Sequence, residues 1–175
     1  GEKVKMNVQR RVVGALAAGV LGAAALAVPA WAHHSFAAYN MEVTRVFTGV
    51  VTRVNPDANH LQIFFAPLNE ARDQVLRDDK GEPIVWGVEM DGASIEARKG
   101  VSVNSFPRGT IMSVGLHPLR NGFPGGGRGK SGLFKCPADT PPAPGKHCDS
   151  VAGSTSHGEG VLPTPTGEPP AKPAG

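Results

Sequence analysis

Two short stretches carry the strongest structural signal in this chain: Phe47 to Val54 (Phe-Thr-Gly-Val-Val-Thr-Arg-Val) and His60 to Ala66 (His-Leu-Gln-Ile-Phe-Phe-Ala). The first is rich in β-branched residues, which favour strands. The second alternates core-type residues with others at the two-residue period of a half-buried strand. Residues 55–59 between them have the Asn/Pro/Asp composition of a turn. The sequence therefore predicts two consecutive antiparallel strands, with a β-bulge at Gly49.

Three further strands and one helix are predicted downstream. The strands are Ile84 to Met90, Thr110 to His117 and Gly132 to Cys136, and the helix is Gly92 to Lys99, ended by Gly100. The polar segment between the second and third strands is interpreted as a long hairpin connection.

This order of elements predicts a mainly β fold. Five short strands with one short helix between the third and fourth suit a small antiparallel barrel of the oligonucleotide/oligosaccharide-binding (OB) type; an open β-sandwich is the alternative. We expect the barrel domain to span residues 33–136, followed at 137–175 by a Pro/Gly-rich disulfide loop and tail. The tail from Ser154 onward has almost no apolar content and is expected to be disordered.

Residues 1–32 have the layout of a secretory signal peptide. Basic residues precede an uncharged run from Val12 to Val28, and Ala30-Trp31-Ala32 places small residues at the two positions that a signal peptidase reads. We expect export to the periplasm with cleavage after Ala32, which leaves no stable membrane span. An uncleaved anchor is the alternative, although the run is shorter and less apolar than the roughly 20 residues of a spanning helix.

The charge balance argues against nucleic acid as a partner. Residues 1–32 carry Glu2 against four basic residues, a net charge of +3 that equals the net charge of the whole chain. The remainder is therefore neutral. Because nucleic-acid binding depends on neutralising phosphates with basic side chains, we expect no such binding.

The two cysteines, Cys136 and Cys148, are expected to form a disulfide, since an even number of cysteines in an exported protein is typical of disulfide pairing. The segment that they enclose holds four prolines. A thiolate metal site that includes His147 is the alternative.

Several motifs, in this order and at this spacing, resemble the DUF6152 family. Family members are small exported proteins of Gram-negative bacteria with no established activity, so the resemblance implies a compartment and a fold but no mechanism. In the family, Asn-Pro-His are consecutive, whereas here residues 57–59 separate Asn55-Pro56 from His60. The matching motifs are His33-His34-Ser35-Phe36-Ala37, Phe47-Thr-Gly-Val-Val51, Asn55-Pro56, Trp86-Gly-Val-Glu89, Arg98-Lys99-Gly100 and Gly115-Leu-His-Pro-Leu-Arg-Asn-Gly122.

A histidine pair at the expected mature N-terminus suggests copper. Cleavage after Ala32 would place the α-amine beside His33 and His34, a nitrogen-rich set that suits Cu(II). His60 and His117, each at the end of a predicted strand, are candidate further ligands. The alternative is that these histidines are ordinary polar residues.

A ligand pocket on the barrel is the second candidate site. Its candidate residues are Trp86, Glu89, Phe64 and Arg120. His60, His117 and Glu89 could also converge on one face of the barrel. The Gly-rich segment 117–127 resembles a phosphate-binding loop, but Pro124 and the glycines disfavour the helix that such a loop requires. We interpret it as a flexible hairpin loop.

No motif indicates a catalytic nucleophile, because none of the serines lies in a Gly-x-Ser-x-Gly context. The sequence therefore favours a non-catalytic periplasmic accessory protein that binds a small ligand or an envelope protein. One alternative is a copper-binding protein, acting as a carrier or as an oxygen-activating enzyme. A second is a structural partner in an envelope complex.

Overall fold

The computed structural model describes residues 37–167. The predicted leader and its cleavage site lie outside the described residues. The elements are β1 (Arg45–Asn55), β2 (Gln62–Pro67), β3 (Trp86–Glu89), α3 (Ala93–Arg98), β4 (Ile111–Pro118), β5 (Gly125–Gly127), β6 (Leu133–Lys135), η2 (Cys148–Ser150) and β7 (Thr155–Ser156).

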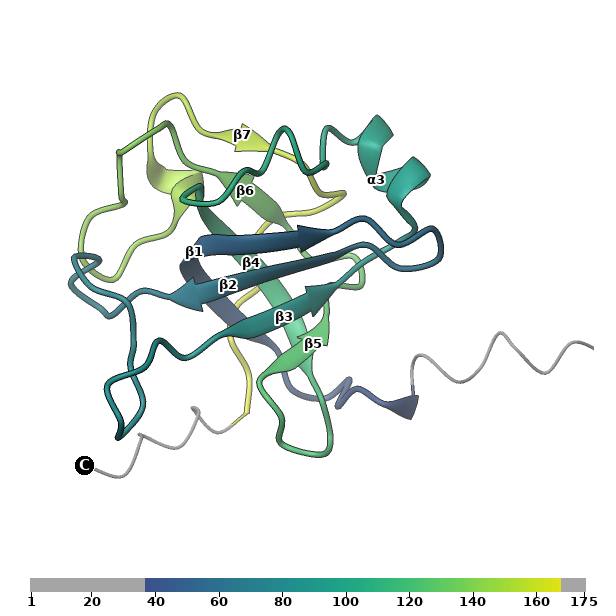
Figure 1. Cartoon of the computed structure of the whole chain (residues 1–175), viewed down its shortest axis with the longest axis horizontal. Coiled ribbons are helices and arrows are strands. Elements are labelled where there is room, and N and C mark those ends of the chain that lie inside the picture. The colour runs from purple at the N-terminus through teal and green to yellow at the C-terminus, as the bar shows by residue number, and fades with distance from the viewer. Residues whose placement is uncertain (1–36, 168–175) are drawn as a thin grey trace, which may run out of the picture. The chain divides into compact units, whose positions relative to one another are not determined.

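Five of these strands form a closed barrel. The hydrogen-bonded order is β1-β2-β3-β5-β4, and β4 pairs back with β1 to close it (Figure 1). The short helix α3 lies between β3 and β4 in the chain, where the sequence predicts it, and Gly100 follows it with a φ of +80°. The expected OB-like barrel with one helix is therefore confirmed.

One strand pairing differs from the antiparallel expectation. β3 and β5 run parallel, with Gly87 opposite Gly125, while the other four pairings in the barrel are antiparallel. The reason is geometric. Strand direction cannot alternate all the way around a ring of five strands, so at least one neighbouring pair must be parallel.

The fifth barrel strand also differs from the predicted one. The strand that closes the barrel is β5, inside the Gly-rich segment that the sequence analysis interprets as a flexible loop. The predicted strand at 132–136 exists as β6, which pairs with β4 between Met112 and Val114, whereas β5 pairs with the following part of β4. All three glycines of β5 are buried. A Cβ on Gly126 would lie 2.3 Å from the His117 carbonyl oxygen, so the close approach of the two strands requires glycine.

The barrel interior contains the apolar residues that alternation predicts. Leu61, Ile63 and Phe65 of the β2 region are at most 1% exposed, as are Val88 of β3 and Val51 of β1. The predicted bulge is displaced: the β1–β2 register shifts between Val51 and Arg53 rather than at Gly49. At Gly49 a Cβ would instead lie 2.6 Å from the Phe65 ring.

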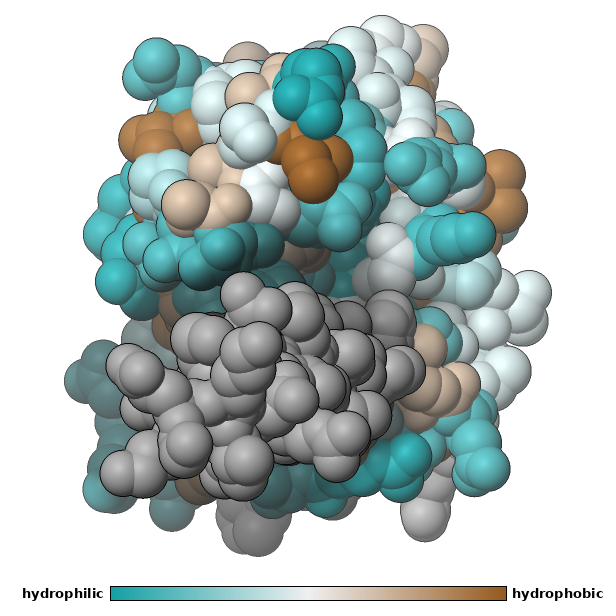
Figure 2. Space-filling model, turned by 90° about the vertical axis from the view of Figure 1, so that its right-hand side faces the viewer, coloured by the Kyte–Doolittle hydropathy of each residue, from teal (hydrophilic) through white to brown (hydrophobic). Residues whose placement is uncertain are grey.

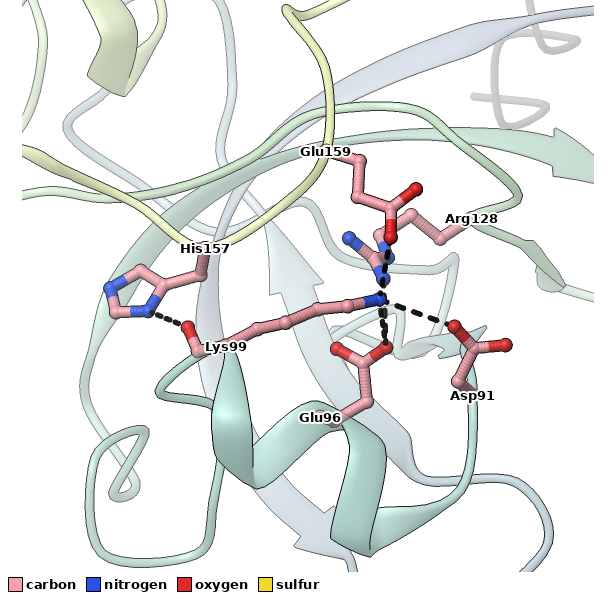
Figure 3. A network of polar contacts seen from close by, with 6 residues as sticks. All are labelled: Asp91, Glu96, Lys99, Arg128, His157 and Glu159. Carbon is pink, nitrogen blue, oxygen red and sulfur yellow. Dashed lines mark hydrogen bonds and ion pairs between the residues drawn. The ribbon is translucent and has the colours of Figure 1, made fainter.

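A buried ion pair joins the end of β5 to α3 (Figure 3). Arg128 donates from Nη2 to Glu96 Oε1 at 2.8 Å, and both side chains are at most 2% exposed. Lys99 extends the network, with Nζ 3.2 Å from both Glu96 and Asp91. The backbone N–H of Arg128 also donates to the Glu89 carbonyl at 2.8 Å. The network therefore holds the ends of β3 and β5 together.

The disulfide is confirmed. Cys136 follows β6 and Cys148 begins η2, and both are buried. The enclosed loop is fastened to the barrel through His147, whose Nδ1 lies 2.8 Å from Thr48 Oγ1. Burial lowers the pKa of His147, and the neighbouring charge of Arg72 lowers it further. With both sulfurs in the disulfide, the alternative of a thiolate metal site is wrong.

The ordered structure extends further along the chain than the sequence predicts. Beyond Ser154, β7 pairs with β6, and Gly132 N–H donates to the Val161 carbonyl at 3.0 Å. Thr166 N–H donates to Thr44 O, also at 3.0 Å. We call residues 155–166 the C-terminal strap. The rest of the predicted tail, 168–175, lies outside the described residues.

The surface visible in Figure 2 carries its hydrophobic residues as separate spots among hydrophilic ones. Such single apolar residues are normal on a protein surface. Within residues 37–167, no helix has the length and apolar character needed to cross a membrane.

Candidate functional site

A cleft of about 220 Å³ lies on the outer surface of the barrel, over β2, β3 and β5. Two residues of the predicted ligand pocket, Phe64 and Glu89, are among its lining residues. Its walls come from the outward-facing positions of these strands, from the segment before β1 and from the connection between β4 and β5. The lining residues are Tyr39, Gln62, Phe64, Val85, Gly87, Glu89, Leu119, Pro124, Gly125 and Gly126.

The Glu89 carboxylate is the polar centre of the cleft. Tyr39 donates its hydroxyl to Oε1 at 2.9 Å, and Gln62 donates from Nε2 to Oε2 at 3.4 Å. His60 Nδ1 lies 3.5 Å from Oε1. These neighbours come from two parts of the chain, the segment before β1 and the start of β2, so the carboxylate of β3 is oriented by tertiary contacts. A carboxylate has about four acceptor sites, which is more than the two hydrogen bonds that Tyr39 and Gln62 donate to it.

Local backbone chemistry places His60 at the start of β2. Asp57 Oδ1 accepts hydrogen bonds from the backbone N–H groups of Asn59, at 2.8 Å, and His60, at 3.2 Å. These two bonds lower the pKa of Asp57, so its carboxyl stays ionised. Gln62 pairs with Glu89 across β2 and β3. Residues 57–59, which separate Asn-Pro from His in this chain, thus form an Asx turn that leaves His60 beside Glu89.

Tyr39 closes one side of the cleft. Its backbone forms an isolated bridge with Leu119, and its ring lies over Gly127, where a Cβ would be 2.8 Å from the ring. Burial raises the pKa of the Tyr39 hydroxyl, and the hydrogen bond to Glu89 and the charge of that carboxylate raise it further. The hydroxyl therefore remains a neutral donor at physiological pH.

The opposite side of the cleft is apolar. The Phe64 ring lies over Gly87, where a Cβ would be 3.2 Å from the ring, and Arg53 covers the ring at 4.2 Å from its centroid. Gly87 of β3 and Gly125 of β5 are partners in the parallel pairing. Val85 precedes Gly87 by two residues, and Phe123 precedes Gly125 by two residues. Val85 and Phe123 are 39% and 69% exposed. The mouth of the cleft therefore has exposed apolar side chains beside it.

Two of the four predicted pocket residues line the cleft and two do not. Phe64 and Glu89 line it. Trp86 is partly buried and packs against the barrel core, where its ring centroid lies 4.6 Å from that of Phe47 at an interplanar angle of 40°. Arg120 lies in the connection between β4 and β5, where its backbone N–H donates to Ala38 O at 2.9 Å, and it is not among the lining residues. The strand alternation that places Glu89 outward places Trp86 inward.

Two lining residues that contact Glu89, Tyr39 and Gln62, are not among the predicted pocket residues. Gln62 could have been found, because it shares the outward face of β2 with Phe64. Tyr39 lies 50 residues from Glu89, in a segment without a strand pattern, and only the fold brings the two together.

The predicted metal ligands do not form a cluster in the part of the chain that the structure describes. His33 and His34 lie outside the described residues. His60 is next to Glu89, whereas His117 Nδ1 lies 2.9 Å from the Val43 carbonyl oxygen. Around the barrel, β1 lies between their strands on one side and β3 and β5 lie between them on the other. Among residues 37–167, no three His, Cys, Asp or Glu side chains are placed to hold a metal ion.

Comparison with known proteins gives one match. The model of a family of unknown function, DUF6152, matches residues 21–128. The chain belongs to the DUF6152 family. The DUF6152 match contains all five barrel strands and every residue that lines the cleft. No curated protein and no solved structure matches the chain.

Proposed function

We propose that this DUF6152 protein is a non-catalytic accessory protein of the periplasm that binds a small ligand in the cleft over β2, β3 and β5. The observation that carries the proposal is the Glu89 carboxylate, held by Tyr39 and Gln62 at the centre of an otherwise mostly apolar cleft. Small-molecule sites combine apolar walls with a few oriented polar groups in this way.

The position of the cleft supports the proposal. Barrels of the OB type bind their ligands on the face of strands 2 and 3, next to the loops that connect strands 1 to 2 and 4 to 5. Here the cleft lies on β2 and β3, and Leu119 and Pro124 belong to the connection between β4 and β5. At about 220 Å³ the cleft is below the roughly 300–1,000 Å³ typical of sites for drug-sized ligands, which favours a smaller molecule.

Two observations support the periplasm. The first is the signal-peptide layout of residues 1–32. The second is the Cys136–Cys148 disulfide, since disulfides persist in oxidising compartments.

Binding can be tested by amide NMR of the purified, isotope-labelled protein with three probes: benzylamine, benzyl alcohol and benzoate. These share a ring and differ in charge. We expect at least one of them to shift resonances of cleft residues. Val85→Trp, which fills the cleft from an exposed position, should abolish the shifts.

Ile95→Trp is the matched control. Ile95 is 40% exposed, close to the 39% of Val85, but lies on α3 away from the cleft lining. Ile95→Trp should leave binding unchanged. The proposal is wrong if none of the probes shifts a cleft resonance, or if Val85→Trp and Ile95→Trp bind equally well.

A further inference from the structure

The charge of the cleft indicates which ligand it takes. Among the described residues of the lining, Glu89 alone carries a formal charge at neutral pH, because the others are apolar, amide-bearing or glycine and Tyr39 stays protonated. Arg53 is near, but its guanidinium lies over the Phe64 ring and it is not part of the lining. The formal charge of the described lining is therefore negative, and His60, whose Nδ1 lies 3.5 Å from Glu89 Oε1, stands outside that lining.

The aromatic rings in the lining also favour a cationic ligand. Tyr39 and Phe64 are both lining residues, and the face of an aromatic ring attracts cations. The Phe64 ring already attracts one, the guanidinium of Arg53 at 4.2 Å. An anion in the cleft would face a carboxylate without a lining cation to balance it. A neutral ligand would gain less from Glu89, since charge-assisted hydrogen bonds are about twice as strong as neutral ones.

The geometry points to a small organic cation as the ligand: a primary ammonium group that donates to the free acceptor sites of Glu89, on a short apolar body that packs between Phe64, Val85 and Leu119. This inference rests on the proposed function, since it names the ligand class of the same cleft. The polar and apolar parts of such a ligand match the two sides of the cleft. The Phe64 ring lies over Gly87 and the Leu119 side chain lies over Gly125, so these two side chains supply the apolar surface against which the body packs.

The three probes test the ligand class. At neutral pH benzylamine is a cation, benzyl alcohol is its neutral analogue and benzoate is an anion. We expect benzylamine to bind about tenfold or more tightly than benzyl alcohol, the ratio given by one charge-assisted hydrogen bond. Benzoate should bind more weakly than both. If benzylamine and benzyl alcohol bind with equal affinity, and neither binds to Val85→Trp, the ligand class is overturned while the proposed function of the cleft stands. If none of the three probes binds, both the ligand class and the proposed function are overturned.

Glu89→Gln should remove the preference, so that benzylamine and benzyl alcohol bind alike. Glu82→Gln is the matched control, because Glu82 is an exposed carboxylate outside the cleft lining. It removes the same charge from the protein and should keep the preference. If both variants lower benzylamine binding equally, the attraction is a general surface effect and the inference fails.

Tyr39→Phe provides a second variant that does not remove the carboxylate. It deletes the hydroxyl that donates to Oε1, so one acceptor site on Glu89 becomes free. Benzylamine should then bind at least as tightly as to the unmodified protein. Loss of benzylamine binding in Tyr39→Phe would mean that the amine contacts the hydroxyl instead of the carboxylate, and would overturn the inference.

Discussion

Tyr39 is the only tyrosine in the chain, so its ionisation can be followed by absorbance without assignment. Its hydroxyl is half-buried and donates to a carboxylate at 2.9 Å. Ionisation would bury a phenolate and place it beside the negative charge of Glu89. Burial and the Glu89 charge both raise the pKa of Tyr39. The ultraviolet absorbance of this tyrosine therefore reports whether its hydroxyl is held against Glu89.

We expect Tyr39 in the folded protein to remain protonated at pH values where a free tyrosine, with its ordinary pKa of 10.0, ionises. Since the folded-state pKa is raised, the stability that the group contributes is complete below the unfolded-state pKa. It is lost as the pH rises through the folded-state pKa. Ultraviolet titration of the native and urea-unfolded protein measures both values.

Glu89→Gln should lower the folded-state pKa of Tyr39, because it removes the neighbouring charge. The effect should be partial, since burial is the larger cause of the shift and remains. Glu82→Gln should leave the titration unchanged. A native protein whose tyrosine titrates like the unfolded one would show that Tyr39 is not held against Glu89.

At the scale of the elements, the Arg128–Glu96 pair connects β5 to α3. The two partners are not equivalent. Glu96 contacts Lys99 as well as Arg128, whereas Glu96 is the only carboxylate in contact with Arg128 among the described residues. Arg128 also has Nε and Nη1 buried without a hydrogen-bond partner. Removing one partner therefore has a different effect from removing the other.

We predict that Glu96→Leu destabilises the protein more than Arg128→Met does, with a loss of roughly 3–5 kcal/mol for the former, because it leaves a buried guanidinium unpaired. In Arg128→Met, Glu96 keeps Lys99. The double variant should lose less unfolding free energy than the two single losses added together, since it buries no unpaired charge. Urea unfolding of the four proteins measures the coupling. Additive losses would contradict the prediction.

The C-terminal strap is also an element-scale feature. It passes so close to the connection before β6 that a Cβ on Gly160 would lie 2.6 Å from the Lys130 carbonyl oxygen. Gly160→Ala should therefore displace the strap and cost roughly 1–3 kcal/mol, the usual range for overpacking. Hydrogen exchange should rise at Gly132, whose N–H is bonded to Val161 O.

Gly109→Ala is the comparison for this variant, because nothing lies within 4 Å of its added Cβ. Its positive φ of +94° introduces backbone strain, but hydrogen exchange at Gly132 should not change. If Gly160→Ala leaves both stability and exchange at Gly132 unaltered, the strap does not hold the barrel.

At the scale of the whole molecule, the disulfide fastens the segment after the barrel. Cys136 and Cys148 are 12 residues apart in sequence and lie at the ends of a loop that contacts Thr48 of β1 through His147. We predict that Cys136→Ala/Cys148→Ala loses about 3 kcal/mol of unfolding free energy, the value of the chain-entropy model for a loop of this size.

Urea unfolding of the unmodified protein with and without dithiothreitol provides the control. Reduction should lower its stability by a similar amount, and the double variant should not respond to the reductant. Equal stability of the oxidised and reduced protein would show that the loop is held by its other contacts alone.

Much of the barrel could be predicted from local pattern. The alternation of apolar residues in 60–66 and 84–90 predicts both the strands and the faces that they bury, and β2 and β3 follow it. The helix at 92–99 and its end at Gly100 follow from local capping rules. The disulfide follows from an even number of cysteines in a chain with a predicted signal peptide. Each of these signals lies within a few neighbouring residues.

The remaining features depend on contacts between distant segments. Gly125–Gly127 has no strand propensity and becomes β5 because only glycine fits between β3, β4 and the Tyr39 ring. The strap is ordered through hydrogen bonds to Gly132 and Thr44, despite its low apolar content.

The amino-acid pattern alone thus determined the strands, their inward faces, the short helix and the outward placement of Phe64 and Glu89, since period and turn chemistry act over neighbouring residues. Tertiary structure decided that Tyr39 reaches Glu89 and that three glycines close the barrel. The physical reason is that these depend on steric fit and hydrogen bonds between segments that only the closed sheet brings within contact distance.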